Sequence, residues 1–268
     1  MLRIVRTMGA LALPALLASS VHALAPAATQ ASGVTARVGD GIVSASRLLP
    51  YDNAFVLTIR SADGRTAQPG IWTDQLRLRT VDGRQAFVRT QGFASFDGRV
   101  KSSVNVFDPA TFAPISNILV NPDGSRERWS FRGLTVEGHL TAAGPNAQDR
   151  VQTLNLAHPA FDLNCCMRSL LPAAVRLRAG ETFTLPAVEV GGDPAEVVFR
   201  VAARERVRAG SRGMVPAWRV DTDGPGGGTI SFWIADTPPF LVRMTLVGIP
   251  GSRDSHGVHY DQYYDMIG

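Results

Sequence analysis

The chain has 268 residues, and its 27 lysines and arginines against 23 aspartates and glutamates give a formal net charge of +4. Hydrophobic residues make up 45% and charged residues 19%, which is enough apolar content to bury a core and excludes wholesale disorder. Two cysteines cannot build a disulfide scaffold or a four-thiolate metal site. Composition therefore indicates a globular protein of one large or two small domains, and it identifies no reaction.

The first 23 residues predict a secretory signal peptide. Arg3 and Arg6 precede a mostly apolar run over residues 8–18, and small or polar residues follow up to Ala23. This order of charge, apolar core and small residues is typical of export signals, and the run is too short to span a membrane. We expect cleavage after Ala23, a flexible leader over residues 24–33, and a periplasmic or extracellular protein without a stable membrane anchor.

The distribution of charge argues against a nucleic-acid partner. Cleavage would remove two arginines and lower the net charge from +4 to +2. Nucleic-acid binders carry a clustered basic surface, whereas the arginines here are spread among acids, as in the segment 204–208. Lys101 is the only lysine.

Asp-Gly pairs recur between strand-like runs of the chain and predict β-hairpins. Asp-Gly between strand-like runs favours the type I′ turn, which needs positive φ at both central residues. The flanking runs are rich in branched and aromatic residues, and Leu76-Arg77-Leu78-Arg79 alternates strictly, which predicts one apolar face and one face with arginine. The pairs are Asp63-Gly64, Asp82-Gly83, Asp97-Gly98 and Asp123-Gly124.

Strand follows strand along most of the chain, with no helical pattern between them. This disfavours a parallel sheet, and so many connected antiparallel strands do not stay flat because strand twist accumulates. The predicted fold is all-β with minor α: a single domain over 34–268 made of a large curled antiparallel sheet, either half-barrel or barrel. The predicted strands are 54–60, 75–81, 84–91, 99–107, 115–120, 126–132, 134–141, 151–156, 181–190, 195–208, 215–222, 228–235, 239–247 and 258–266.

One short helix is predicted from Asp162 to Leu171, packed on the sheet. Asp162 suits an N-cap, Pro172 would end the helix, and apolar residues recur at helical spacing between them. This apolar stripe is expected to cover the concave face and to line a ligand groove. The candidate groove residues are Leu163, Met167, Leu170 and Leu171.

Cys165 and Cys166 are adjacent, which leaves three interpretations: structural thiols, a vicinal or intermolecular disulfide, or a soft-metal site. Consecutive helical residues point about 100° apart, so a bridge between the two would distort the helix. We expect Cys166 to be buried and no vicinal disulfide to form.

The C-terminal segment gathers imidazole and carboxylate groups at His256, His259 and Asp261. On an extended strand His259 and Asp261 share a face, while His256 lies on the other. Such a set is incomplete without ligands from another strand, so no metal and no cofactor are predicted.

Motifs for catalysis are missing from the sequence. His139 and His158 have no acid or nucleophile at motif spacing, and the nucleophile elbow Gly-x-Ser-x-Gly is absent. The glycine-rich segment Gly224–Gly228 lacks a following Lys-Ser/Thr and predicts a hairpin loop rather than a phosphate site. The pattern favours a non-enzymatic role.

The stretch Phe107–Ser116 (FDPATFAPIS) resembles the D-P-x-T-hydrophobic-x-P element of a family of exported bacterial proteins catalogued as a domain of unknown function. The resemblance implies a curled antiparallel sheet related to the lipoprotein carrier and receptor of the bacterial envelope, which holds acyl chains in its concave face. It implies no catalytic residues. Together with Phe107–Ser116, the similar pieces fall between about residues 75 and 247: Phe161-Asp162 leading to Leu170-Leu171, Leu177–Gly180, Ala217–Val220, Phe232–Ile234 and Leu241–Arg243.

Three functional hypotheses follow. The leading one is a non-enzymatic periplasmic protein that binds or carries a lipid or another hydrophobic ligand in the groove of the sheet. The second is an envelope hydrolase or metal-dependent enzyme on the same sheet, with His139, His158, His256 or His259 as its base. The third is a structural or interaction module that uses an exposed strand edge. The sequence identifies neither the ligand, nor a protein partner, nor the oligomeric state.

Overall fold

The computed structural model describes residues 33–144, 148–164, 167–189, 194–253 and 257–268. Residues Ala31–Gly268 form one compact unit. The predicted signal peptide and the predicted leader up to residue 32 lie outside the described residues, and so do Cys165, Cys166 and His256.

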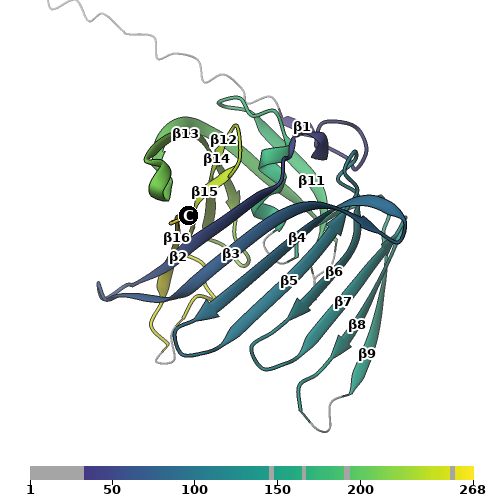
Figure 1. The fold of residues 1–268 in the computed structure, drawn as a ribbon, viewed down its shortest axis with the longest axis horizontal. Helices are drawn as coiled ribbons and strands as arrows, with labels where there is room; N and C mark the ends of the chain where they lie inside the picture. The colour runs from purple at the N-terminus through teal and green to yellow at the C-terminus, as the bar shows by residue number, and fades with distance from the viewer. Residues whose placement is uncertain (1–32, 145–147, 165–166, 190–193, 254–256) are drawn as a thin grey trace, which may run out of the picture. The chain divides into compact units, whose positions relative to one another are not determined.

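The first half of this unit is a run of antiparallel strands in which each strand pairs with the next along the chain. Figure 1 shows them side by side as one curved wall. Short turns between consecutive strands allow only this neighbouring, antiparallel arrangement. The strands are β2 Tyr51–Ser61, β3 Thr66–Val81, β4 Arg84–Ser95, β5 Val100–Phe107, β6 Pro114–Val120, β7 Arg126–Arg132, β8 Thr135–Thr141 and β9 Asp149–Asn155.

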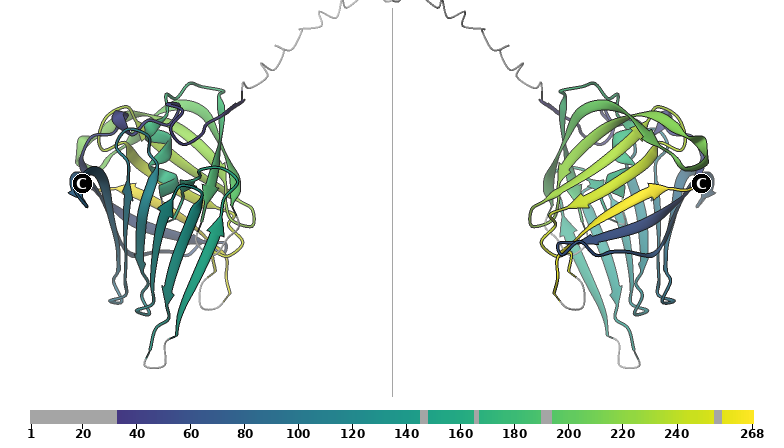
Figure 2. Two further views of the ribbon diagram at one scale, coloured as in Figure 1. Left: turned by 90° about the vertical axis from the view of Figure 1, so that its right-hand side faces the viewer. Right: turned by 90° about the vertical axis from the view of Figure 1, so that its left-hand side faces the viewer.

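The second half continues the same sheet. Strands β11 to β16 pair in sequence order, and β16 pairs antiparallel with β2, which joins the two halves. Figure 2 shows the resulting two walls facing each other with their strands crossing. The strands are β11 Thr182–Val188, β12 Ala195–Arg208, β13 Met214–Asp223, β14 Thr229–Ala235, β15 Leu241–Val247 and β16 Tyr260–Met266.

The sheet is curled but not closed. At one edge, β1 (Gly33–Thr35) and β10 (Phe161–Asp162) both pair in parallel with β11, and β9 forms the other edge. Within the described residues no pairing joins β9 to β1 or β10. The prediction of a large curled, mostly antiparallel sheet is confirmed, and of the two forms expected it is the open one.

The Asp-Gly pairs all form turns, but only one has the backbone geometry that the sequence predicts. At Asp82-Gly83 both residues have positive φ, 47° and 76°, as a type I′ turn requires. Gly64, Gly98 and Gly124 also have positive φ, but the aspartates before them do not. Those aspartates instead accept a hydrogen bond from the backbone N–H two residues later. The three turns therefore belong to the longer hairpin class in which glycine occupies the left-handed position after the turn.

The helical cover is present, but it is shorter and later in the chain than predicted. Two 3₁₀ turns, η2 (Met167–Ser169) and η3 (Leu171–Ala174), replace an α-helix over 162–171. Asp162 does not cap them, because it lies in β10 with its carboxylate buried. Pro172 occupies the first turn of η3 rather than ending a helix, a place where proline loses no hydrogen bond. The other two helical turns are η1 Ala45–Arg47 and η4 Gly210–Arg212.

The element that resembles the exported family is the connection between β5 and β6. One carboxylate oxygen of Asp108 accepts hydrogen bonds from the backbone N–H groups of Ala110 and Thr111, at 2.9 and 2.8 Å. Phe112 has a φ of 61° and stacks on Phe107, with ring centroids 4.4 Å apart. The motif therefore folds a tight turn and directs an aromatic ring into the core.

The main core lies between the two walls, under η2 and η3. Two aromatic groups dominate it: Phe87, Phe107, Phe112 and Phe161 on one side, and Phe183, Phe199 and Phe232 on the other.

A second, smaller core surrounds Trp129. The indole covers Gly138 on the neighbouring strand, where an added Cβ would lie 2.5 Å from the ring. Glycine is therefore the residue that leaves room for Trp129.

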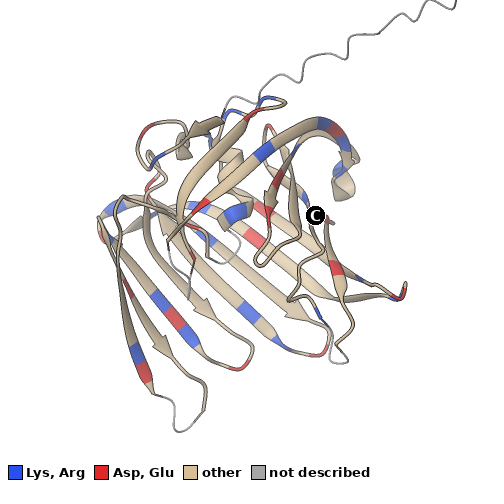
Figure 3. Cartoon of the chain, turned by 180° about the vertical axis from the view of Figure 1, so that it is seen from behind, with Lys and Arg blue, Asp and Glu red and all other residues tan. Residues whose placement is uncertain are grey.

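Charged residues are intermixed along the strands, as Figure 3 shows from behind. Opposite charges pair across the sheet, for example Arg200 with Asp223 at 3.0 Å and Arg243 with Asp265 at 3.0 Å. In the part of the chain that the structure describes, no helix has the length and apolar character of a membrane span.

Candidate functional site

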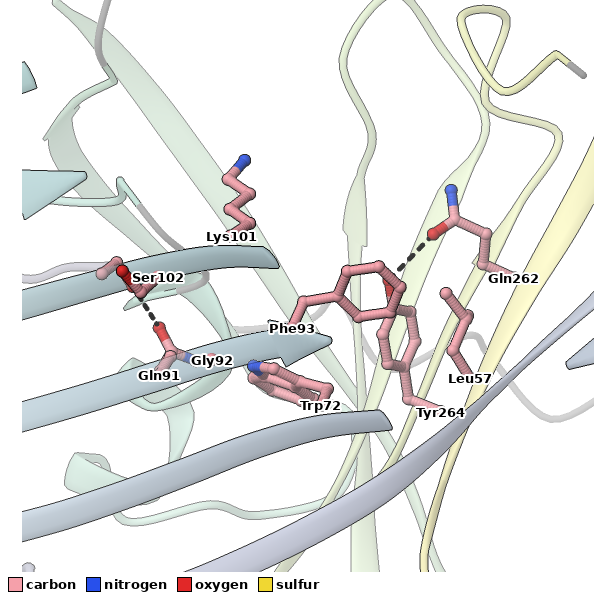
Figure 4. Close-up of a pocket in the computed structure, with 10 residues that line it drawn as sticks. Leu57, Trp72, Gln91, Gly92, Phe93, Lys101, Ser102, Gln262 and Tyr264 are labelled. Atoms are coloured by element: carbon pink, nitrogen blue, oxygen red, sulfur yellow. Dashed lines mark hydrogen bonds between the residues drawn. The ribbon is translucent and has the colours of Figure 1, made fainter. Parts of the chain in front are cut away.

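A cavity of about 280 Å³ opens on the concave side of the sheet, where β2 and β16 meet β3, β4 and β5. Apolar surface makes up most of its wall, and polar side chains lie on two sides: Gln91, Ser102 and Lys101 on one, and Gln262 on the other (Figure 4). Ligand sites in proteins are typically concave, mostly apolar and supplied with a few polar groups. The cavity is lined by Leu57, Trp72, Gln91, Gly92, Phe93, Lys101, Ser102, Ser103, Gln262 and Tyr264.

The register of the sheet places three of these side chains in one row across neighbouring strands, together with the core residue Phe55. Phe55 on β2 is opposite Trp72 on β3, Trp72 is opposite Phe93 on β4, and Phe93 is opposite Lys101 on β5. Directly opposite residues point to the same face, because side chains alternate along every strand. The row begins in the core, where Phe55 is fully buried, and ends at the exposed Lys101.

Aromatic contacts hold the buried end of this row. The rings of Phe55 and Trp72 stack with centroids 4.8 Å apart, and Tyr264 meets Trp72 edge-on at 5.5 Å. Such pairs orient rings beyond what burial alone achieves. The wall of the cavity is therefore fixed in place, with Phe93 partly exposed at its open side.

The polar groups of the cavity are mostly engaged with one another. The Ser103 hydroxyl lies 3.5 Å from the Gln91 amide oxygen, and the Tyr264 hydroxyl donates to the Gln262 oxygen at 2.9 Å. Lys101 differs, because none of the described residues forms an ion pair with it. It is the one charged side chain of the lining.

A buried ion pair lies on the same inner face, one step deeper. Arg89 on β4 donates to both carboxylate oxygens of Asp74 on β3, at 2.8 and 2.6 Å, and both side chains are fully buried. Arg89 also donates to the Ser169 hydroxyl at 2.9 Å and contacts the Met167 sulfur at 3.7 Å. Burial raises the pKa of Tyr51, whose hydroxyl is 3.3 Å from Asp74, although the nearby Arg89 charge opposes this. This network, called the floor below, lies next to the cavity on the inner face, because Asp74 is directly opposite Gln91, which lines the cavity.

A second buried carboxyl lies further along this floor. Asp162 accepts hydrogen bonds from the side-chain amides of Asn105 at 2.8 Å, Asn117 at 3.1 Å and Asn164 at 2.7 Å. Burial raises the pKa of Asp162 to about 6, although these hydrogen bonds favour the charged form. The amide oxygens of Asn105 and Asn117 are buried and have no hydrogen-bond partner among the described residues.

The four predicted groove residues all lie in the core. Leu163, Met167, Leu170 and Leu171 are each at most 3% exposed and belong to the main core cluster. None of them lines the cavity of about 280 Å³. The structure therefore places them in the main core, and their contact with a ligand stays a prediction.

The predicted histidine and metal candidates lie elsewhere. His139 is exposed and pairs with Glu137 at 3.0 Å, and His158 is exposed. His259 Nε2 lies 3.3 Å from Asp261, the pairing on one strand face that the sequence predicts. Among the described residues, no group of three or more His, Cys, Asp or Glu side chains could hold a metal ion.

A larger depression, at the tips of β7 to β9, is less suited to an apolar ligand. It measures about 520 Å³, and charged residues of both signs line it, among them Arg126, Glu127, Asp149 and Arg150. Mixed charges and an open tip favour water over an apolar molecule.

Sequence reasoning did not identify Trp72, Phe93, Lys101 and Tyr264 as site residues. The available signal was alternation: the predicted strands 84–91 and 99–107 reach or adjoin Phe93 and Lys101. Alternation shows which residues share a face, but not where along the strand that face is left uncovered.

Comparison with known proteins identifies the family. The family model "Protein of unknown function (DUF3108)" matches residues 71–249, which include Trp72, Phe93 and Lys101. Among solved structures, the chain is similar to a β-barrel-like protein of the domain of unknown function DUF1849 from Brucella abortus. The two are 11% identical, with a TM-score of 0.45 over 82% of this chain and 97% of that one. No curated protein matches the chain. Because the family model covers more than half of the sequence, the chain belongs to the DUF3108 family of proteins of unknown function.

Proposed function

We propose that this protein is an exported, non-enzymatic binding or carrier protein that holds an apolar chain in the concave cavity. The observation that carries the proposal is the cavity itself: an aromatic wall formed by Trp72, Phe93 and Tyr264 on the inner face of an unclosed sheet. When an apolar ligand displaces water from a concave apolar surface, the free energy of the complex falls by about 25 cal/mol for each Å² of apolar surface buried.

The fixed floor supports this proposal. Because Arg89 and Asp74 bind each other and also contact Ser169 and Met167, β3 and β4 are held in place next to the cavity. A preformed site loses little conformational entropy when a ligand binds. The resemblance of the sequence to an exported family points in the same direction, because it implies a sheet related to that of the lipoprotein carrier and receptor, which holds acyl chains.

Export is the second part of the proposal. It rests on Arg3, Arg6 and the apolar run over 8–18, the order of residues that export machinery recognises. The protein should be recovered from the periplasm or the medium with Leu24 as its first residue, as N-terminal sequencing would show. Recovery from the cytoplasm with an intact Met1 would contradict this part.

Binding is tested with an uncharged probe. The mature protein is titrated with 1-N-phenylnaphthylamine, whose fluorescence rises in an apolar site. We expect saturable binding that is displaced by decanol.

Two variants locate the site of binding. Ser103→Phe places a ring among the cavity walls and should weaken binding about tenfold, the loss equivalent to about two buried methylene groups. Val100→Phe adds the same ring on the exposed outer face of β5 and should leave binding unchanged. No saturable binding, or equal effects of the two variants, would overturn the proposal.

A further inference from the structure

The cavity is apolar at its buried end and charged at its exposed end. Along the cross-strand row, exposure rises from Trp72, which is 4% exposed, through the partly buried Phe93 to the exposed Lys101. The only charge in the lining stands at the exposed end of this row. A surface that is apolar at one end and cationic at the other matches an amphiphile of opposite polarity.

We propose that the cavity takes a single-chain amphiphile with a carboxylate head group, of the fatty-acid type, with its chain along Trp72 and Phe93 and its carboxylate at Lys101. This rests on the proposed function, because it assigns the head group of a ligand in the same cavity.

The sign of the head group follows from the charges around the cavity. None of the described residues that line it is acidic. Asp74, in the floor, pairs with Arg89, and Asp97 in the hairpin before β5 pairs with Arg99 at 2.8 Å. The Lys101 ammonium is thus the one charge of the lining without an ion-pair partner among the described residues. It should attract an anion and repel a cation.

The size of the cavity limits the ligand to one chain. Strands lie about 4.8 Å apart, so the row from Trp72 to Lys101 spans about 10 Å across β3, β4 and β5. The volume of about 280 Å³ is at the lower end for ligand sites, which leaves room for one alkyl chain.

The head group is assigned by charge and geometry. A lysine ammonium is a compact point charge and balances the single charge of a carboxylate. A phosphate monoester carries about −1.5 to −2 at neutral pH and favours arginine forks, which this lining lacks.

The experiment compares chain-matched ligands in competition with 1-N-phenylnaphthylamine, at pH 8, in low salt and below micelle-forming concentrations. The ligands are decanoate, decanol, decyl phosphate and decyltrimethylammonium. We expect decanoate to bind about fivefold more tightly than decanol, the gain of one partly exposed charge pair. Decyltrimethylammonium should bind more weakly than decanol, and decyl phosphate no better than decanoate.

Three variants test the role of Lys101. Lys101→Met removes the charge but keeps an unbranched apolar stem, so decanoate should lose its advantage while the affinity for decanol stays within about twofold. Lys101→Arg should restore the preference, and Lys101→Glu should reverse it towards decyltrimethylammonium. Arg79→Met is the control, because it removes the same charge on the outer face, about 23 Å along β3 from Trp72.

The outcomes separate this inference from the proposed function. If decanol binds and decanoate binds no better, or if Lys101→Met leaves the preference intact, the head-group assignment is wrong and the apolar site stands. Tighter binding of decyl phosphate than of decanoate would also overturn the carboxylate assignment. If no ligand displaces the probe, the proposed function itself fails.

Discussion

Side chains alternate between the two faces of the sheet along the whole of β4, but those on the inner face are buried at one end and line an open cavity at the other. At one end Phe87 is 5% exposed and packs against Phe107, and Arg89 is fully buried under Met167 and Ser169. At the other end Phe93 lines an open cavity. The difference lies in the cover: Met167 and Ser169 of η2 contact Arg89 at the first end, whereas none of the described residues of η2 and η3 lines the cavity at the second. Alternation thus decides which face a residue occupies, and the covering segment decides whether that face becomes core or site.

This comparison predicts where the protein tolerates change. The covered end contains paired charges and close packing, so any loss there leaves a void or an unpaired charge. The open end already borders solvent, so a loss there changes binding more than stability.

The largest effect is expected at the buried ion pair. Arg89→Met leaves Asp74 buried without its partner and should lower the free energy of unfolding by about 3–5 kcal/mol. Chemical denaturation with urea measures this. The exposed pair provides the control: Arg99→Met, which breaks the contact with Asp97, should cost less than about 1 kcal/mol. Equal losses in the two variants would show that the floor is not buried from solvent.

The next largest effect distinguishes a residue of the covering segment, Leu170, from a residue that lines the cavity, Phe93. Leu170 is 2% exposed, and its replacement by alanine should lower the free energy of unfolding by about 2–5 kcal/mol, because the lost side chain leaves a cavity. Phe93→Ala removes more atoms but borders a cavity already, so we expect a smaller loss of stability and a weaker affinity for the uncharged probe. Denaturation and probe titration of both variants test this. If Leu170→Ala proves the milder of the two, the packed end has been assigned wrongly.

A pH effect of up to about 3 kcal/mol is expected from Asp162. Its pKa is raised to about 6 in the folded protein, so the folded state binds its proton more tightly than the unfolded state, whose pKa is near 3.8. This contribution to stability is complete below about pH 4, falls as the pH rises to about 6, and is absent above it.

The variant Asp162→Asn should remove this slope. The buried amide oxygens of Asn105 and Asn117 have no hydrogen-bond partner among the described residues, so after rotation of its amide either oxygen can accept a hydrogen bond from the new side chain. The measurement is the free energy of unfolding of both proteins at intervals from pH 4 to 7, with Asp123→Asn in an exposed turn as control. A difference between wild type and Asp162→Asn that does not change with pH would contradict the prediction.

The smallest of these effects concerns the second core. Gly138→Ala adds a Cβ that would lie 2.5 Å from the Trp129 ring, and overpacking of this kind costs about 1–3 kcal/mol. Gly92→Ala is a matched change on the same wall, where the nearest atom is the Thr73 hydroxyl at 3.1 Å. We expect the first change to cost clearly more than the second, as measured by thermal unfolding.

Much of the fold could be predicted because strand patterns are local. The runs 84–91 and 195–208 lie within strands β4 and β12, and the Asp-Gly pairs fall at turns. Turn type was harder to predict. The aspartate carboxylates accept hydrogen bonds from backbone N–H groups and so stabilise a three-residue loop, which an Asp-Gly pair alone does not distinguish from a tighter turn.

The helical cover shows where local patterns fail. The apolar residues at helical spacing are buried, as an apolar stripe predicts: Leu163, Met167 and Leu170. However, Asp162 lies in strand β10, and short 3₁₀ turns follow instead of a helix. Packing against the sheet, rather than the period of the sequence, determines the backbone here.

The site could not be predicted for a related reason. The alternation at Leu76 to Arg79 predicted an apolar face and an arginine face, yet Leu78 is 47% exposed and Arg89 is buried on the inner face. A buried arginine requires a carboxylate from a neighbouring strand, here Asp74, and that pairing depends on register. The cavity likewise arises from curvature and incomplete cover, which are properties of the whole sheet.

An apolar site on the concave face is tested most directly by observing the four tryptophan indoles separately. The N–H signals of Trp72, Trp129, Trp218 and Trp233 are recorded by NMR with labelled indole nitrogen while decanol is added. We expect a saturable shift of the Trp72 signal, with the other three unchanged, because of the four only Trp72 lines the cavity of about 280 Å³. A Trp72 signal that stays in place while decanol binds, or equal shifts of all four, would contradict an apolar site on the concave face.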